Sequence, residues 1–251
     1  MTAEMTGDAV LNRLTLLDPE GYEHMLEALS QTADGVIIGF LNQHGYNLII
    51  EQPHLQRRFL EVDYLLRDGI GMKLACKLNG IDPGLNLNGT DFIPALLENI
   101  RANASQPLDY YAMGTREPWL TRGAANLFGS RRVRTLDGFQ KEQDYVDFFR
   151  DYSTPGRLAV VVLAMGMPKQ ERIAQLLKHR SDCACLIICG GAILDFAAHR
   201  VDRAPQWMRV SGLEWLFRLF REPRRLFRRY VIGIPRFLLY VLRNRAPAKG
   251  E

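Results

Sequence analysis

The sequence has little cysteine, and its four cysteines do not form a disulfide framework. Cys183, Cys185 and Cys189 lie on or beside one apolar run, whereas Cys76 stands alone. This pattern is typical of small core residues in a reducing compartment. No second cluster of cysteine or histidine accompanies them to complete a tetrahedral site. The sequence therefore predicts no metal centre.

Long hydrophobic runs are also absent. No stretch reaches the ~18 uncharged apolar residues that a membrane-spanning helix needs, so we expect no such helix. The first residues include Glu4 and no apolar run, which is unlike a secretory signal peptide. We therefore expect the protein in the cytoplasm. No Gly-x-Gly-x-x-Gly follows the first apolar run, which argues against a dinucleotide-binding oxidoreductase.

Positive charge is concentrated in the last part of the chain. Residues 200–251 hold thirteen Lys or Arg, twelve of them Arg, and four Asp or Glu, a net charge of +9. Residues 1–199 carry a net charge of −5, so the total is only +4. This asymmetry indicates a segment that meets anions: nucleic acid, a phosphate ligand or anionic lipid.

Between residues 35 and 199, short apolar runs alternate with amphipathic stretches. The run 158–163 is apolar on both alternating faces, which is typical of a parallel strand covered by helices on both sides. The alternation predicts an α/β fold with a doubly wound, mainly parallel sheet. The predicted strands are 35–41, 62–66, 108–113, 132–136, 158–165 and 184–189, and the predicted helices are 69–78, 91–102, 117–128, 142–152 and 169–179.

The last 52 residues have a different pattern. Between residues 212 and 231, apolar residues recur at helical spacing with arginines opposite, and Pro223 interrupts the pattern. Pro235 begins a second apolar segment, 237–242. We therefore divide the chain into a core, 1–199, and a basic amphipathic helical appendage, 200–251. The apolar face holds Leu213, Leu216, Phe217, Phe220, Phe227, Tyr230 and Val231, and the basic face Arg218, Arg221, Arg225, Arg228 and Arg229.

Several polar or glycine-rich segments follow the predicted strands, where an open α/β sheet binds ligands. Gly69 and Gly71 follow the strand at 62–66 and open a helix, whose free N–H groups suit an anion. Asp68 before them is either the N-cap of that helix or a functional carboxylate. Comparable segments are Gly89-Thr-Asp91, where Thr90 or Asp91 could serve only as a cap, Gly166-Met-Pro-Lys-Gln-Glu171, and Gly190-Gly-Ala-Ile-Leu-Asp195.

These segments occur in a specific order. They are followed by Arg203-Ala-Pro-Gln-Trp207, by Gly212-Leu-Glu-Trp-Leu-Phe-Arg218 and by the arginine-rich run 222–230. Together they resemble the WecG/TagA/CpsF glycosyltransferases over roughly residues 35–232, most strongly after Gly166. The resemblance implies a Rossmann-like core with a membrane-associating appendage. It also implies inverting transfer of N-acetylmannosamine, its uronic acid or glucose from a UDP-sugar. The acceptor would be a polyprenyl-diphosphate-linked saccharide of bacterial surface or exopolysaccharide synthesis.

The resemblance makes Asp68 the general base that takes the proton of the acceptor hydroxyl. The sequence contains no Asp-x-Asp motif for a metal, and its nearest imitations, 61–63 and 142–144, fit a solvated surface. We therefore expect neither a metal nor another cofactor. Arginine can neutralise the UDP diphosphate instead, because its planar fork binds phosphate through two hydrogen bonds. The candidates are Arg200, Arg203, Arg218, Arg225 and Arg228.

One departure from the family concerns the end of the first strand. Family members carry a Thr-x-Asn segment there, whereas this chain has Phe40-Leu41-Asn42, so only the asparagine matches. The donor sugar and the acceptor stay open, and an exopolysaccharide branch that uses UDP-glucose is compatible. Gln43 and His44 either bind sugar or start a helix. The expected substrate-binding residues are Asn42, Gln43, His44, Gly69, Gly71, Thr90, Asp91, Gly166, Lys169, Gln170, Glu171, Gly190, Gly191 and Asp195.

The competing interpretation is an α/β nucleotide- or nucleic-acid-binding protein without transferase activity. The arginines would suit it, but aromatic residues dominate the apolar face of the appendage and no known nucleic-acid motif occurs. We expect a UDP-sugar, a polyprenyl-diphosphate-linked glycan and anionic inner-membrane lipids as partners, and no nucleic acid. A homo-oligomer is compatible with the sequence. The expected location is the inner face of the cytoplasmic membrane.

Overall fold

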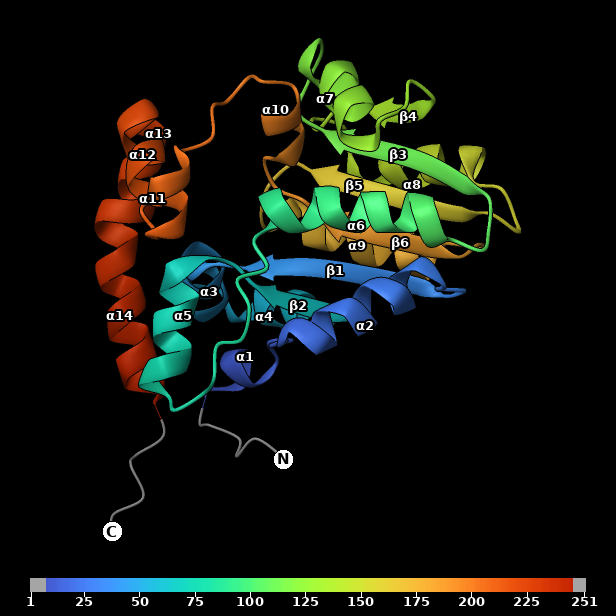
Figure 1. Cartoon of the computed structure of the whole chain (residues 1–251). Helices are drawn as coiled ribbons and strands as arrows, with labels where there is room; N and C mark the ends of the chain where they lie inside the picture. The colour runs from blue at the N-terminus through green and yellow to red at the C-terminus, as the bar shows by residue number, and fades with distance from the viewer. Residues whose placement is uncertain (1–7, 246–251) are drawn as a thin grey trace.

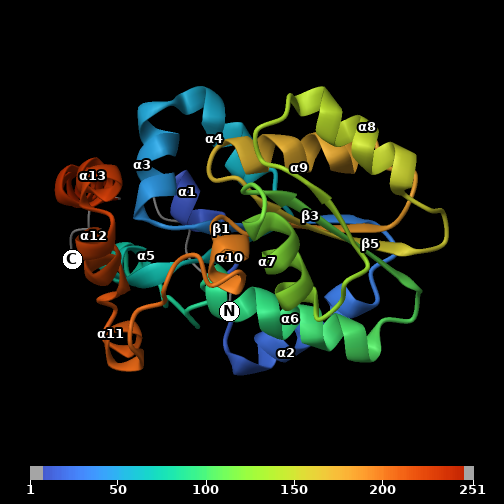
Figure 2. The same cartoon turned by 90° about the horizontal axis from the view of Figure 1, so that it is seen from above.

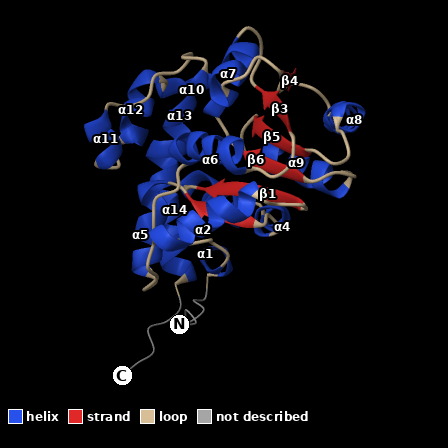
Figure 3. Ribbon diagram, turned by 45° about the vertical axis from the view of Figure 1, so that its right-hand side comes forward, coloured by secondary structure: helices blue, strands red, loops and turns tan. Residues whose placement is uncertain are grey.

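The fold is built on one sheet of six parallel strands in the order β2-β1-β6-β5-β3-β4. A computed structural model describes residues 8–245 of the chain (Figure 3). The sheet confirms the predicted α/β fold, which is Rossmann-like. Its strands are β1 (Gly35–Leu41), β2 (Tyr64–Arg67), β3 (Leu108–Gly114), β4 (Val133–Leu136), β5 (Leu158–Ala164) and β6 (Cys185–Cys189).

Helices cover both faces of the sheet, because the central strands are apolar on both sides. In β5, Val161 and Leu163 face one hydrophobic core, and Val160 and Val162 face the other. The first core is closed by α1 (Ala9–Asn12), α3 (Gln43–Glu51), α4 (Pro53–Leu60), α5 (Gly69–Leu78), α8 (Glu142–Tyr152) and α9 (Lys169–His179). The second is closed by α2 (Pro19–Ser30), α6 (Gly89–Asn103), α7 (Trp119–Phe128) and α10 (Ile193–Ala197).

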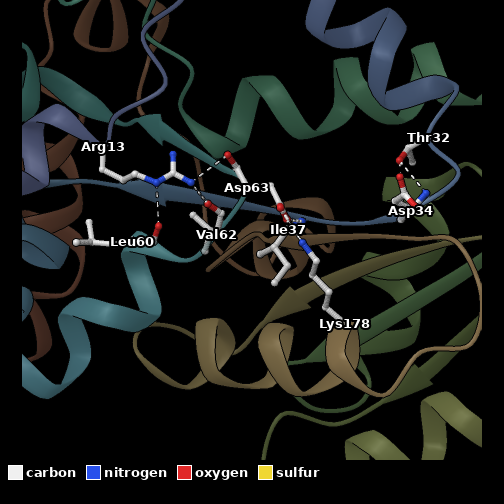
Figure 4. Close-up of polar contacts among 8 residues, drawn as sticks. All are labelled: Arg13, Thr32, Asp34, Ile37, Leu60, Val62, Asp63 and Lys178. Atoms are coloured by element: carbon white, nitrogen blue, oxygen red, sulfur yellow. Dashed lines mark hydrogen bonds and ion pairs between the residues drawn. The ribbon is translucent and has the colours of Figure 1, made fainter.

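The start of β2 differs from the prediction by two residues, and Asp63 explains the difference. Its carboxylate accepts hydrogen bonds from the Ile37 amide at 2.6 Å and from Lys178 Nζ at 2.7 Å (Figure 4). The Asp63 amide donates to the Ile37 carbonyl oxygen at 3.0 Å, so the Ile37 carbonyl pairs with the backbone of Asp63 while the Ile37 amide pairs with its side chain. Arg13 donates to the carbonyl oxygens of Leu60, at 2.8 Å, and of Asp63, at 3.3 Å. Asp63 is therefore a structural anchor, although its side chain remains partly exposed to solvent.

Four helices before residue 61 lay outside the sequence prediction, although their start signals are present. Asp18 accepts a hydrogen bond from the Gly21 amide at 2.8 Å and precedes Pro19, the first residue of α2. Asn42 accepts from the amides of His44, at 3.1 Å, and Gly45, at 3.2 Å, and so caps α3. Asparagine and aspartate are favoured at N-caps for this reason. Of the two alternatives for residues 43 and 44, the helix start is observed.

The C-terminal segment forms a layer of helices beside the carboxyl ends of the strands (Figures 1 and 2). Pro235 lies in the first turn of the last helix, where a missing N–H group is tolerated. The apolar residues after it therefore do not form a separate segment. The layer consists of α11 (Gln206–Val210), α12 (Glu214–Arg221), α13 (Pro223–Phe227), the π-helical turn Arg228–Ile232 and α14 (Gly233–Asn244).

This helical layer is docked on the core through a buried stripe. Phe237 is buried and meets Tyr46 of α3 edge to face, with ring centroids 5.3 Å apart. Asn47 Nδ2 donates to the Gly233 carbonyl oxygen at 2.8 Å. The expectation that Tyr230 lies on an outward apolar face was wrong, because it is only 4% exposed and packs on Trp215. No helix within residues 8–245 is long and apolar enough to cross a bilayer.

Candidate active site

A cleft of about 1560 Å³ separates the carboxyl ends of the strands from the C-terminal helices. Parallel α/β sheets bind their ligands at this edge, because the loops that follow the strands converge there. Every strand contributes to the lining through the residues that follow it: Asn42 after β1, Asp68 after β2, Thr115 after β3, Phe139 after β4, Gly166 after β5 and Gly190 after β6.

Asp68 occupies the N-cap position of α5 without capping it. Its side chain makes no capping hydrogen bond within the described residues, and Asn86 Oδ1 accepts from the Gly69 amide instead, at 2.9 Å. Asn42 Nδ2 donates to Asp68 Oδ2 at 3.3 Å. Of the two alternatives for Asp68, the side chain does not act as the N-cap of α5. Its carboxylate is directed to the cleft.

Burial and the surrounding charges act in opposite directions on the proton affinity of Asp68. Burial is the largest influence and raises the pKa of Asp68 above its ordinary value. The hydrogen bond from Asn42 and the positive charges of Arg229 and Arg218 lower this pKa and so limit the shift. A carboxylate with a raised pKa is a stronger base than one in water, while the arginines keep it ionisable.

Arg229 is a site residue that the sequence prediction missed. It is half-buried, and within residues 8–245 its Nε has no hydrogen-bond partner. Burial lowers the pKa of His44 to about 4, with a further contribution from the charge of Arg229, so His44 is neutral at pH 7. The sequence placed Arg229 on the basic face with its neighbours. Only the packing of the helical layer brings the charge of this arginine near enough to act on Asp68.

Four of the five predicted arginines line the cleft. Arg218 lies over the ring of Phe196, 5.5 Å from its centroid, and its buried Nε lacks a hydrogen-bond partner within residues 8–245. Arg200 Nη1 donates to Asp195 Oδ1 and to Thr115 Oγ1, each at 3.1 Å. Arg225, which is hydrogen-bonded to Glu222, and Arg228 complete the set.

The fifth arginine, Arg203, anchors the helical layer instead of lining the cleft. Its Nη1 lies 2.7 Å from Asp91 Oδ1, and Arg209 lies 3.7 Å from the same oxygen. The hydrogen bond from Arg203 lowers the pKa of Asp91. Asn88, and neither Thr90 nor Asp91, caps α6 by accepting from the Asp91 amide at 3.1 Å. A direct contact of Arg203 with substrate is therefore not supported by its position.

Lys169 and Glu171 also lie outside the cleft lining, and both support loops that form it. Lys169 Nζ donates to the carbonyl oxygens of Gly138, at 2.8 Å, and Gln140, at 3.1 Å. The fully buried Gln170 accepts from the Gly191 amide at 3.0 Å and donates to Glu171 Oε1 at 2.8 Å. Burial raises the pKa of Glu171 to about 7. Its position beneath Gln170 corrects the expectation that it contacts substrate.

The remaining predicted residues line the cleft as expected from their strand ends. Gly69, Gly166 and Gly191 have φ angles of 85°, 80° and 61°, a region that side chains disfavour. Phe40 stands at the position of the family's threonine and offers no hydroxyl group. Its ring is buried and packs on Phe92. The residues in question are Asn42, Gln43, His44, Gly69, Gly71, Thr90, Asp91, Gly166, Gln170, Gly190, Gly191 and Asp195.

Two further strand ends contribute residues that the sequence prediction missed. Thr115 donates its hydroxyl to Asp195 Oδ1 at 2.7 Å, and Phe139 lies at the rim. Both follow predicted strands, so the rule that ligands bind at strand ends could have identified them. Within residues 8–245, no group of three or more His, Cys, Asp and Glu side chains is arranged to hold a metal ion.

The molecule has a parallel sheet with a cleft at its carboxyl edge. In that cleft lie the Asp68 carboxylate, which makes no capping hydrogen bond, and several arginines. These features define an α/β enzyme. Over residues 11–251 the chain matches the glycosyl transferase WecG/TagA/CpsF family, and it belongs to that family. The resemblance noted in the sequence is thereby confirmed. A similar curated protein is the N-acetylglucosaminyldiphosphoundecaprenol N-acetyl-β-D-mannosaminyltransferase of Bacillus spizizenii. It is 27% identical over 245 residues, which cover 95% of this chain and 93% of the relative.

Proposed function

We propose that the protein is an inverting glycosyltransferase that moves a hexose-type sugar from a UDP-sugar to a polyprenyl-diphosphate-linked saccharide. The observation that carries this proposal is the Asp68 carboxylate, which is free of capping bonds and faces the arginines of the cleft. The similar protein from Bacillus spizizenii supports an acceptor that ends in N-acetylglucosamine and favours N-acetylmannosamine among the three candidate sugars.

In the proposed reaction, Asp68 takes the proton of the acceptor hydroxyl as its oxygen forms a bond to the anomeric carbon. The bond between that carbon and the β-phosphate oxygen breaks, and its electron pair leaves with UDP. Attack from the face opposite UDP inverts the anomeric configuration. General-base help of this kind typically contributes about 10²–10⁴-fold to the rate.

The departing diphosphate requires positive charge, and the C-terminal helices supply it as arginine. The charges of Arg218 and Arg229 act on Asp68, the proposed base, and Arg225 and Arg228 also line the cleft. Hydrogen bonds from guanidinium to phosphate are charge-assisted and roughly twice as strong as neutral ones. We propose that these arginines take the place of a divalent metal.

The outer side of the helical layer is proposed to lie on the inner face of the cytoplasmic membrane. Phe227 and Val231, and then Leu239 and Leu242 of α14, are exposed at near-helical spacing, and Phe220 of α12 is 75% exposed. Arginines flank them, and each basic residue near an anionic surface contributes about 1 kcal/mol. A lipid-linked acceptor cannot leave the bilayer, so this placement brings the cleft to its substrate.

The test is a transfer assay that combines a panel of UDP-sugars with a synthetic lipid-diphosphate-linked N-acetylglucosamine. We expect one UDP-sugar to yield a product with inverted anomeric configuration, and activity to persist in excess EDTA. If activity is lost in EDTA and recovers with magnesium or manganese, a metal ion and not the arginines neutralises the departing diphosphate. Binding of DNA or RNA without turnover of any sugar nucleotide would favour the competing interpretation.

A further inference from the structure

The residue after Asp68 has a backbone conformation that is unusual for the start of a helix. Gly69 begins α5 with a φ of 85°, whereas helical residues have a φ of about −63°. A Cβ atom on Gly69 would meet nothing within 4 Å. Glycine is therefore required here for its conformation and not for space. The chain thus leaves the helical path directly after the proposed base.

Two side chains hold Gly69 in this conformation. Asn86 Oδ1 accepts from the Gly69 amide at 2.9 Å, and Arg67 Nη1 donates to the Gly69 carbonyl oxygen at 3.2 Å. Arg67 Nη1 also donates to Asn86 Oδ1 at 3.4 Å, so the two side chains are joined. Both backbone polar groups of Gly69 therefore bind side chains that α5 does not supply. We call Asn86 and Arg67 together the Gly69 clamp.

The clamp is itself fixed to the core. Arg67 is only 3% exposed, and it donates through Nε to the Pro83 carbonyl oxygen at 2.8 Å and through Nη2 to that of Gly84 at 3.2 Å. A buried charge is costly unless it is hydrogen-bonded, so the guanidinium keeps these oxygens together. The Leu85 amide donates to the Leu17 carbonyl oxygen at 2.8 Å, which ties the same loop to the segment before α2.

Aspartate at an N-cap ordinarily bonds the amides of its own helix, and this chain shows it twice. Asp8 accepts from two amides of α1, and Asp18 accepts from one amide of α2. Asp68 occupies the same position at α5 and accepts from none of its amides within the described residues. Neither Asp8 nor Asp18 is followed by a residue with a positive φ, as Asp68 is. The missing cap therefore coincides with the clamped glycine.

We propose that Asn86 is a positioning residue for the general base, because its hydrogen bond to the Gly69 amide holds the Asp68 carboxylate away from the start of α5. The inference rests on the proposed role of Asp68. When Asn86 is absent, Gly69 is free to adopt a helical φ, and Asp68 turns to cap α5 as the other two aspartates cap their helices. A carboxylate that caps the helix no longer points at the acceptor hydroxyl.

The test is steady-state kinetics of the full-length Asn86→Ala variant over a range of pH. We expect kcat to fall about 10- to 100-fold, less than the about 10²–10⁴-fold for complete loss of a base. KM for the donor and KM for the acceptor should stay unchanged. The acid limb of kcat/KM should move to lower pH, because amides at a helix start stabilise the ionised carboxylate.

The charges around Asp68 are the same in Asn86→Ala and in the unaltered protein, so the position of the acid limb reports the direction of the carboxylate. Burial raises the pKa of Glu214 of α12, and the charge of Asp68 adds to that shift. His44 of α3 is neutral at pH 7. The positive charges that act on Asp68 are Arg229 of the π-helical turn, Arg218 of α12 and Arg67 of β2.

Two further variants separate positioning from a general loss of structure. Asn86→Asp keeps an oxygen for the Gly69 amide and should recover most of the turnover, with the acid limb moved to higher pH by the added negative charge. Gly69→Ala disfavours the positive φ while Asn86 stays in place, and should lower kcat and move the limb as Asn86→Ala does. Asn79→Ala alters the other end of α5, outside the cleft lining, and should leave kcat and the limb unchanged.

The outcomes distinguish this inference from the proposed function. An unchanged kcat and acid limb in Asn86→Ala would overturn the positioning role and leave Asp68 as the base. A raised KM with an unchanged kcat would overturn it too, because Asn86 would then bind substrate directly. If Asp68→Asn retains normal turnover, the proposed base itself is wrong.

Discussion

The side-chain amide of Asn42 joins a helix cap to the carboxylate of Asp68. Its oxygen accepts from the His44 and Gly45 amides, so its nitrogen must point the other way, where it donates to Asp68 Oδ2 at 3.3 Å. The orientation of the amide is therefore fixed by the start of α3. The same asparagine stabilises the ionised form of the proposed base and holds it at the ends of β1 and β2.

Asp68→Asn should reduce turnover by about 10²–10⁴-fold, because an amide cannot take the proton of the acceptor hydroxyl. UDP affinity and the melting temperature should stay close to those of the unaltered protein, since Asp68 makes no capping bond within the described residues. Asp34→Asn is the matched control, because Asp34 is an exposed carboxylate at the opposite end of β1. Near-normal turnover of Asp68→Asn would remove the base from the mechanism.

The pH dependence of kcat/KM should show an acid limb above the ordinary carboxyl range, because Asp68 must be ionised to act and burial raises its pKa. Asn42→Asp keeps an oxygen that can cap α3 but replaces the hydrogen-bond donor with a second negative charge. The acid limb should then move to higher pH. A limb that stays in place would show that another group controls it.

The sequence predicted most of the core and less of the site, for different physical reasons. The bounds of β1, α5, α8 and α9 follow from local periodicity and match the prediction. The roles of Tyr230 and Arg203 could not be predicted in this way, because both depend on how the helical layer docks on the core. That docking involves distant residues such as Asp91 and Tyr46. An amphipathic pattern shows that a helix has an apolar face. It does not show whether protein or lipid covers that face.

Glu171 should make the stability of the protein depend on pH. Its unfolded carboxyl has a pKa of ~4.3, and burial raises the pKa to about 7 in the folded protein. Between these values the folded state holds more protons than the unfolded state, so the free energy of unfolding falls as pH rises. The slope is at most about 1.4 kcal/mol per pH unit.

Glu171→Gln removes this titration and should flatten the dependence between pH 5 and pH 7, because glutamine stays neutral and its oxygen can still accept from Gln170. Urea unfolding at several pH values measures the effect. The exposed Glu98→Gln should retain the slope of the unaltered protein. Equal slopes for Glu171→Gln and the unaltered protein would show that Glu171 is not the group responsible.

Membrane attachment is best tested without shortening the chain. Truncation after Tyr230 would remove Phe237 and Val241, which are buried against the core, and so would unsettle the fold together with any lipid contact. Leu239→Ser combined with Leu242→Ser changes only exposed positions of α14. Each leucine that enters the bilayer contributes up to about 1.5–3 kcal/mol. The double variant should therefore lose tenfold or more of its affinity for anionic liposomes.

Turnover of a soluble acceptor analogue separates this role from chemistry, since neither leucine lines the cleft. The double variant should process the analogue at the normal rate and the lipid-linked acceptor in vesicles more slowly. Tyr152 is an exposed aromatic residue at the end of α8, away from the helical layer. As a control, Tyr152→Ser should leave liposome binding unchanged. Sedimentation with vesicles of neutral and anionic lipid gives the affinities. If the unaltered protein does not bind anionic vesicles, the exposed leucines of α14 do not contact the membrane, and the proposed attachment is wrong.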